Sequence, residues 1–318
     1  MPPHPGPPVR TRRRQPSKMA QVSSSVYARL PTERPNPRTR HIDRRSALGI
    51  ARAINREDAL VAAAVSRQSR AIARGMEMLA GCLRRKGAVI FLGAGTSGRL
   101  AVLEAAECPP TYGTTSREIR AVMAGGKSSV FHSKEGAEDD PLSGARAVSG
   151  LSRNDAVVGI AASGVTPFVR AALRAARRQG CRTILVTSNG RPPGDPAELT
   201  IAPDVGPEVV AGSTRMKSGT AAKLVLNTLT TGTMILLGKV YDRWMVDLKP
   251  TSRKLRLRGE RIIAELGRVS PARARALFKS AGGSVKTAVV MVRKELTAQQ
   301  ARKLLAFCDG SLRKALEI

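Results

Sequence analysis

The amino-acid sequence predicts an α/β fold in which helices pack on a parallel β-sheet. Short apolar segments, typical of buried strands, alternate with longer segments whose apolar residues recur at helical spacing. The connections between them are short, which favours right-handed crossovers between parallel strands. The chain has 318 residues, of which 42% are hydrophobic and only 3% aromatic. Small aliphatic side chains must therefore form most of its core.

Three regions are expected along the chain. Residues 1–31 are rich in Pro and Arg and precede the first acidic residue, Glu33, so we expect a disordered basic extension there. Whether Met1 or Met19 begins the natural chain stays open. Residues 32–265 are predicted to form the main domain, and residues 266–318 a small helical subdomain.

The predicted elements follow one another in a regular order. The expected strands are 88–92, 119–123, 156–161, 182–187 and 199–202. The expected helices are 47–55, 59–83, 99–108, 168–179, a long helix ending at 238, and then 271–280, 285–294 and 297–305. Pro109 and Pro110 are expected to end the third of these helices, because proline lacks the amide donor that a helix interior needs.

The net charge of +30 is the most unusual compositional feature. Such a charge is typical of proteins that bind nucleic acid, anionic membranes or acidic substrates. We nevertheless favour a solvated basic surface without a nucleic-acid partner, because aromatic stacking platforms and known nucleic-acid motifs are missing. Four scattered cysteines without metal-ligand spacing favour reduced thiols and no metal. With no membrane span or signal peptide in the sequence, we expect a cytoplasmic protein.

A glycine-rich segment, 93–98, connects the first strand to a helix and has the pattern G-x-G-x-x-G. Backbone amides and the dipole at such a helix N-terminus favour binding of a phosphate. A dinucleotide site would also need an acidic residue near the end of the second strand, for the ribose. The segment 121–125 contains none, so a different phosphate compound is favoured.

Hydroxyl side chains gather at three expected loops. Because ligands of parallel sheets bind beyond the carboxyl ends of the strands, these loops are expected to surround one phosphate. Ser and Thr also cap helices, which is their commonest role there, and one cluster alone would be explained that way. Three clusters favour a site. Its predicted binding residues are Gly95, Thr96, Ser97, Gly98, Ser163, Gly164, Thr166, Ser213, Thr214 and Lys217. Arg99 and Arg215 are further candidate cations.

The scarce carboxylates supply the candidate acid and base. Glu107 lies near the expected end of an Ala-rich helix, where the dipole and desolvation should favour its protonated form, as a general acid requires. Glu104, one turn earlier, competes for this role on sequence alone. Glu135, Glu138 and Asp139 form a second acidic cluster, which holds a base or merely solvates a loop. The nearby His132 is a weaker candidate.

Several longer motifs resemble the N-acetylmuramic acid 6-phosphate etherase family. They are Leu92–Leu100, Glu107–Gly113, Glu135–Asp139, Gly159–Gly164, Gly212–Ala221, Met245–Asp247 and Lys286–Ala288. The resemblance covers the chain from about Thr32 onward, and the segment through Pro109 and Pro110 is the most specific part. Val165 is a departure, since a polar or basic residue is expected at its position.

The resemblance implies a sugar isomerase (SIS) fold, which is a three-layer αβα sandwich, with a helical C-terminal subdomain. It implies a homodimer without metal or other cofactor, which cleaves the D-lactyl ether of N-acetylmuramic acid 6-phosphate during cell-wall sugar recycling. Glu107 matches the family's proton donor, and Glu138 matches its second catalytic acid. A non-catalytic phosphosugar sensor of the same fold is the alternative, and a sugar-sensing DNA-binding regulator is a third reading.

One geometric expectation concerns the dimer. Glu107 lies about 13–15 Å along the helix from Gly98, at roughly 1.5 Å per residue. That distance is long for a sugar phosphate anchored at Ser97 of the same chain. We therefore expect Glu107 to act in the active site of the partner subunit.

Overall fold

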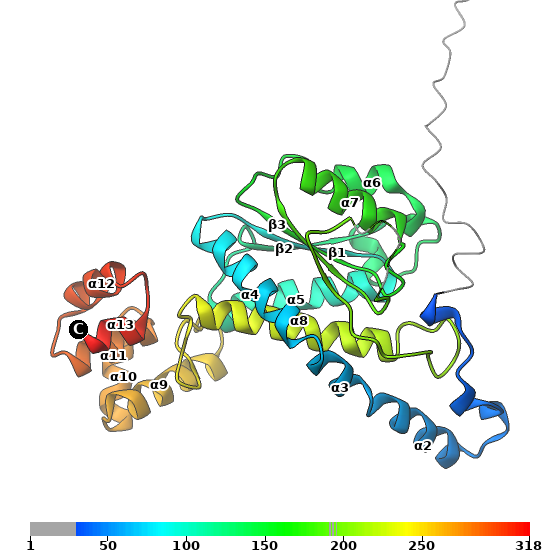
Figure 1. The fold of residues 1–318 in the computed structure, drawn as a ribbon. Helices are drawn as coiled ribbons and strands as arrows, with labels where there is room; N and C mark the ends of the chain where they lie inside the picture. Colours follow the sequence, from blue (N-terminus) through cyan, green and yellow to red (C-terminus); the bar gives the residue numbers. More distant parts are fainter. Residues whose placement is uncertain (1–29, 191, 193, 195) are drawn as a thin grey trace, which may run out of the picture.

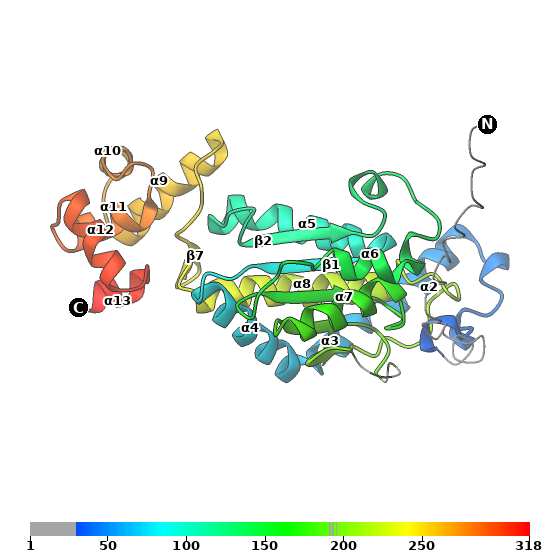
Figure 2. The ribbon, with the colours of Figure 1, turned by 90° about the horizontal axis from the view of Figure 1, so that it is seen from above.

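The structure, a computed structural model, describes residues 30–190, 192, 194 and 196–318. Its centre is a parallel sheet with helices on both faces (Figures 1 and 2). The strands have the order β2-β1-β3-β4-β5, and every neighbouring pair is parallel. The predicted α/β class is confirmed.

All five predicted strands are present, with ends that differ from prediction by at most one residue. The strands are β1 (Val89–Gly93), β2 (Ile119–Met123), β3 (Ala156–Ile160), β4 (Arg182–Val186) and β5 (Leu199–Ile201). Every residue of β1 and β3 is buried. A strand that is covered on both faces has no polar face, and this is why the apolar runs predicted the strands so well.

Four helices cover one face of the sheet. They are α3 (Val61–Ser66), α4 (Ser69–Arg84), α5 (Gly95–Tyr112) and α8 (Lys217–Leu236), and their apolar side chains share one core cluster with the strands. The single helix predicted over 59–83 is wrong, because the chain bends between α3 and α4. There Ser69 donates a hydrogen bond to the Ser66 carbonyl, and the Gln68 side chain accepts one from the Ala202 amide at 3.2 Å.

The opposite face is covered by α6 (Pro141–Arg146) and α7 (Pro167–Arg178), which pack against each other and around a second core cluster. Asp140 caps α6 by accepting hydrogen bonds from the amides of Leu142 and Ser143, both at 3.0 Å. The acidic segment before it forms the short 3-10 turn Ala137–Asp139. The two faces together make the three layers that were expected.

The N-terminal segment runs along the end of the sandwich before α2 (Ala47–Asp58), which projects away from it (Figure 1). Short 3-10 turns precede α2 at Pro31–Glu33, Pro37–Thr39 and Ile42–Arg44. The predicted extension ends at residue 31, but Leu30 is already buried and Pro31 begins a 3-10 turn. The remainder of the extension, 1–29, lies outside the described residues.

The C-terminal helices form a bundle with a core of its own, beyond the end of α8 (Figure 2). The antiparallel pair β6 (Val240–Tyr241) and β7 (Trp244–Met245) leads into it. The helices are α9 (Arg253–Gly267), α10 (Pro271–Ser280), α11 (Val285–Arg293), α12 (Ala298–Phe307) and α13 (Leu312–Glu317). The predicted boundary at 265/266 falls inside α9. The buried residues of the bundle's core cluster begin at Val246, and Tyr241, Trp244 and Met245 pack against them.

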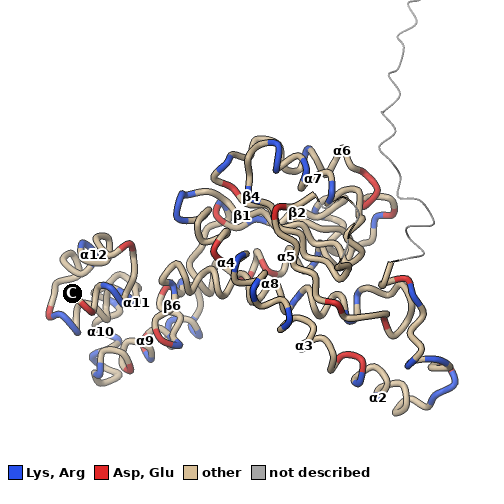
Figure 3. The backbone as a smooth tube through the Cα atoms, in the orientation of Figure 1, with Lys and Arg blue, Asp and Glu red and all other residues tan. Residues whose placement is uncertain are grey.

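Basic residues are spread over the sandwich, the projecting α2 and the C-terminal helices (Figure 3). This distribution favours a solvated basic surface over one concentrated anion-binding face. Among the described residues, no helix has the length and apolar character needed to cross a membrane. Nor do the described His, Cys, Asp and Glu side chains form a group of three that could hold a metal ion.

Candidate functional site

The glycine-rich loop joins β1 to α5 directly. Gly95 has a φ of +53°, which suits glycine, and Gly98 lies against the end of β1. A Cβ at Gly98 would lie 2.6 Å from the Gly93 carbonyl oxygen, so only glycine permits this approach. No side chain caps α5 at its N-cap residue, Ala94. Its first amides, which have no partner within the helix, are therefore available to an anion.

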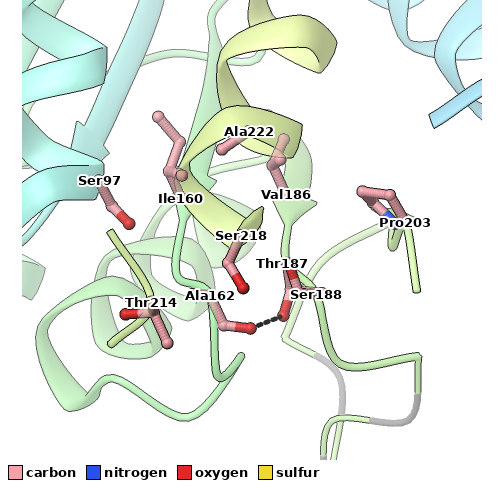
Figure 4. A pocket seen from close by; sticks show the side chains of 11 residues that line it. Ser97, Ile160, Ala162, Val186, Thr187, Ser188, Pro203, Thr214, Ser218 and Ala222 are labelled. Atoms are coloured by element: carbon pink, nitrogen blue, oxygen red, sulfur yellow. Dashed lines mark hydrogen bonds between the residues drawn. The ribbon is translucent and has the colours of Figure 1, made fainter. Parts of the chain in front are cut away.

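The carboxyl ends of three adjacent strands meet beside this loop. Gly93, Ile160 and Val186 are the last residues of β1, β3 and β4, and they are in register across the sheet. A small pocket opens there between the strand ends and the start of α8 (Figure 4). Its lining is rich in hydroxyl groups and comprises Ser97, Ile160, Ala162, Val186, Thr187, Ser188, Pro203, Thr214, Ser218, Gly219 and Ala222. We call it the hydroxyl pocket.

Helix capping does not explain the hydroxyl side chains near the starts of α5, α7 and α8. The N-cap residues of α5 and α8 are Ala94 and Met216, and Thr166 at the N-cap of α7 makes no side-chain capping bond. In contrast, six helices elsewhere in the described chain have a Ser or Thr cap that accepts a backbone hydrogen bond. These caps are Ser46, Ser252, Ser270, Ser284, Thr297 and Ser311. Helix capping therefore leaves the hydroxyls of Ser97 and Thr214 available for another role.

The predicted binding residues divide into three groups. Ser97 and Thr214 line the hydroxyl pocket directly. Ser163 follows the pocket residue Ala162, and its Oγ accepts a hydrogen bond from the Val165 amide at 3.3 Å. The remaining hydroxyl and glycine residues of the prediction lie on the same loops, but do not line this pocket; they are Gly95, Thr96, Gly98, Gly164, Thr166 and Ser213.

Lys217 differs from the sequence prediction, because its ammonium group is fully buried and turned away from the hydroxyl pocket. It donates hydrogen bonds to the Glu57 carboxylate and to the Val205 carbonyl, both at 2.7 Å. Hydrogen bonding from Arg38 is the main cause that lowers the pKa of Glu57 to about 2, and Lys217 and Asn36 contribute further. Lys217 therefore connects α8 to α2, and we leave it out of the phosphate contacts.

The candidate cations Arg99 and Arg215 also differ in their surroundings. Arg99 donates hydrogen bonds to the carbonyls of Val130, at 2.7 Å, and Ser129, at 3.1 Å. It thereby fixes the loop after β2 to the first turn of α5. Arg215 is exposed at the surface.

A second cavity, of about 150 Å³, lies on the other side of the glycine-rich loop. Its lining includes Gly95, Arg99, Ser129, Glu135 and Glu138, and we call it the acidic pocket. Glu138 is exposed at the surface, but desolvation by its neighbours, and then the like charges of Asp139 and Glu135, raise its pKa. Glu138 thus lies beside the glycine-rich loop that would hold the phosphate. Its raised pKa makes it a stronger base than an ordinary glutamate.

The two candidate acids on α5 face different surroundings. Glu104 is buried, accepts a hydrogen bond from Thr230 and forms an ion pair with Lys223 at 3.1 Å. Glu107 is exposed and has neither a hydrogen bond nor an ion pair with any residue that the structure describes. The expected burial of Glu107 among alanines is therefore wrong for the single chain. The Glu104 carboxylate thus connects α5 to α8, whereas the Glu107 carboxylate is accessible to a ligand.

The proline pair near Glu107 does not end its helix. Helix α5 continues through Pro109 and Pro110 to Tyr112, and Gly113 ends it with a φ of +68°. Proline has a helical φ, so the backbone can continue, although the carbonyls four residues earlier lose their amide donors. The prediction that Pro109 and Pro110 end this helix is therefore wrong.

Sequence reasoning missed the residues that support the loop after β3. The Thr187 hydroxyl donates to the Ala162 carbonyl at 3.0 Å, and the Asn189 amide group donates to the Ser163 carbonyl at 3.1 Å. Arg170 holds the next carbonyl, that of Gly164, at 3.0 Å. No motif pointed to these residues. Thr187 and Asn189 contact a loop about 25 residues earlier in the chain, and Arg170 folds back onto Gly164, six residues before it.

Part of the sandwich matches an SIS domain at the level of sequence. A sequence model of the glucokinase regulatory protein N-terminal SIS domain matches residues 71–177. A phosphoheptose isomerase from Francisella tularensis has a similar fold, with a TM-score of 0.46 and 14% identity over 60% of this chain and all of that chain.

The chain belongs to the N-acetylmuramic acid 6-phosphate etherase family. An etherase of that name from Salinibacter ruber is 46% identical over 93% of this chain and 97% of its own length. The Rhodopirellula baltica etherase is 47% identical over 90% of this chain and 96% of its own length. The family resemblance of the sequence motifs is thereby confirmed.

Proposed function

We propose that this protein cleaves the D-lactyl ether of N-acetylmuramic acid 6-phosphate, giving N-acetylglucosamine 6-phosphate and D-lactate in cell-wall sugar recycling. Relatives that carry the etherase name match 90% or more of the chain. The observation that carries the proposal within the structure is the pair of pockets around one glycine-rich loop. One pocket offers hydroxyls beside free helix amides, and the other holds a carboxylate with a raised pKa.

The phosphate is proposed to bind at the N-terminus of α5. The amides there meet the negative charge, and hydroxyls from Ser97, Thr214 and the Ser163 loop surround it. The sugar then extends past Gly95 into the acidic pocket, where Glu138 lies.

The ether is too unreactive for direct hydrolysis, so the chemistry begins with an opened sugar ring. The aldehyde at C1 acidifies the C2 hydrogen, and Glu138 removes that proton. The electron pair of the C2–H bond forms a C2=C3 double bond as the C3–O bond breaks, and the lactyl oxygen leaves with a proton from Glu107. Water then adds across the double bond, with its oxygen joining C3. Two carboxylates suffice for these proton transfers, without a metal or redox cofactor.

We further propose that the protein is a homodimer in which Glu107 acts in the partner's site. Helix α5 is continuous from Gly95 to Tyr112, so Glu107 lies roughly 14 Å along the axis from Gly98. Leu103 occupies the same face of α5 one turn earlier, and 41% of its surface is exposed. An interface that buries Leu103 against a second chain would also bring Glu107 close to that chain.

The proposal places the reaction in the cytoplasm, where thiols stay reduced. All four cysteines are free and buried, as suits a reducing compartment. The alternative of a non-catalytic phosphosugar sensor draws on the match to the glucokinase regulatory protein domain. We do not favour it, because the relatives that cover nearly the whole chain are etherases and both candidate carboxylates are present.

The direct test is to incubate the purified full chain with N-acetylmuramic acid 6-phosphate and to measure D-lactate. Glu138→Gln should remove activity by several orders of magnitude, because a base that takes part in proton transfer contributes about 10²–10⁴-fold and here serves two steps. The matched control is Glu77→Gln, since Glu77 is exposed on α4 and outside both pockets. No D-lactate from the wild-type protein would contradict the proposal.

A further inference from the structure

The structure points to Ser218 as a further phosphate ligand, and we propose that its hydroxyl donates a hydrogen bond to a phosphate oxygen of the bound sugar phosphate. This inference rests on the proposed function, and it adds to it a residue that the motifs did not indicate. Ser218 lies in the first turn of α8, next to Lys217, whose side chain the structure assigns to an internal ion pair.

The Ser218 hydroxyl is buried without a partner. The residue is only 2% exposed, and its Oγ finds no hydrogen-bond partner among the residues that the structure describes. Buried hydroxyls are nearly always hydrogen-bonded, because an unpaired one destabilises the folded chain. Because this unpaired hydroxyl lies in the lining of the hydroxyl pocket, a group bound at the pocket can accept its hydrogen bond.

The ordinary partners of a serine at this helix position are excluded by a neighbouring carboxylate. Glu208 is fully buried and accepts hydrogen bonds from the amides of Lys217, at 3.0 Å, and Ser218, at 2.9 Å. It acts as the cap of α8, so Ser218 has no capping role. Its hydroxyl also makes no bond to the carbonyl one turn earlier, which is the other local option.

The Glu208 carboxylate also makes the N-terminus of α5, rather than that of α8, the favoured place for the anion. Its carboxylate already neutralises the first amides of α8, whereas the first amides of α5 are uncapped. The phosphate charge is therefore best placed at α5, and α8 can contribute only neutral donors. Ser218 and Thr214 are the hydroxyl residues that this region brings to the hydroxyl pocket.

Figure 4 shows Ser97 and Ser218 in the lining of the hydroxyl pocket, with Ser97 coming from α5 and Ser218 from the start of α8. No carboxylate lines this pocket, whereas Glu135 and Glu138 line the acidic pocket. An anion is favoured on the hydroxyl side for this reason, and the sugar on the acidic side. The ligand of Ser218 is thus the phosphate group.

The test is Ser218→Ala in the full-length protein, with binding followed by titration calorimetry. The probes are N-acetylglucosamine 6-phosphate, inorganic phosphate and unphosphorylated N-acetylglucosamine. Loss of one hydrogen bond to an anion should weaken binding of both phosphate compounds about tenfold. The melting temperature of the unliganded variant should stay the same or rise, because the substitution removes an unpaired buried hydroxyl.

Thr114→Val is the matched control. Its hydroxyl is likewise buried and unpaired, but it lies outside both pockets. This variant should keep the melting temperature and the affinity of the wild-type protein for both phosphate compounds.

Each other outcome overturns the assignment in a recognisable way. Unchanged phosphate affinity in Ser218→Ala, with normal binding by the wild-type protein, would remove Ser218 from the site and leave the proposed function intact. Weaker binding together with a clearly lower melting temperature would mean a structural role. A change confined to N-acetylglucosamine would mean a sugar contact. If the wild-type protein binds neither phosphate compound, the phosphosugar site itself is wrong.

Discussion

At the scale of single residues, the proposed role of Glu138 in proton abstraction depends on its local charge environment. It lies on a short acidic turn, where desolvation and the neighbours Asp139 and Glu135 disfavour its charged form. A carboxylate with a raised pKa holds a proton more strongly once it has taken it. This suits the base that removes a weakly acidic C2 proton.

The pH dependence of catalysis should follow the Glu138 charge. The base must be ionised, so kcat/KM should rise with pH as Glu138 loses its proton. Asp139→Asn removes one repelling charge, lowers the pKa of Glu138 and should move this acid limb to lower pH. Asp242→Asn, at an exposed position in the β6–β7 turn, is the control and should leave the profile unchanged. An acid limb that stays in place in Asp139→Asn would show that Glu138 does not set it.

At the scale of elements, side-chain contacts hold the start of α8 beside the carboxyl ends of the strands. Two buried carboxylates do this, since Glu208 caps the helix and Glu57 on α2 pairs with Lys217. The Glu57–Lys217 contact joins segments 160 residues apart in sequence, whereas Glu208 lies only nine and ten residues before the two amides that it binds. The strand ends and hydroxyl loops could be predicted, because they depend on local apolar runs and glycines. The role of Lys217 could not, because its position in the motif says nothing about the direction of its ammonium group.

Glu57→Gln tests this connection between α2 and α8. It leaves the Lys217 ammonium buried without its counter-charge, and breaking such a buried pair costs about 3–5 kcal/mol of unfolding free energy. Denaturant unfolding at neutral pH measures the loss. The double variant Glu57→Gln, Lys217→Met should recover part of it, since no buried charge is then left unpaired. Equal stability of the single variant and the wild-type protein would contradict this role.

The Glu57 contribution should also depend on pH with a defined sign. Because its pKa is lowered from the ordinary 4.5 to about 2 in the folded chain, the ionised form stabilises the fold. This stabilisation is fully present above about pH 4.5 and is lost as the pH falls toward 2. The stability difference between wild type and Glu57→Gln should therefore narrow over that range.

At the scale of the whole molecule, the proposed dimer would supply the site in which Glu107 acts. Helix α5 carries the phosphate anchor at one end and Glu107 at the other. From sequence, the family motif identified Glu107, but the helix end was placed too early, at the proline pair. The helical turns between Gly98 and Glu107 keep Glu107 away from its own loop, which favours the proposed action across a dimer.

Mixed dimers test this arrangement. Glu107→Ala and Glu138→Gln subunits should each be inactive alone, because each lacks one of the two proposed catalytic carboxylates in every site. If Glu107 acts in the partner's site, a verified heterodimer of the two variants contains one intact site and regains activity. Homodimers of each variant, assayed at the same concentration, are the controls. No recovery in verified heterodimers would place Glu107 in the site of its own chain.

The central claim is that the ether is cleaved by elimination followed by addition of water at C3. The most direct measurement is the reaction of N-acetylmuramic acid 6-phosphate in water enriched in heavy oxygen, with mass analysis of both products. The proposed route predicts the heavy oxygen at C3 of N-acetylglucosamine 6-phosphate and none gained in the lactate hydroxyl. Heavy oxygen in the lactate hydroxyl, with none in the sugar, would contradict it.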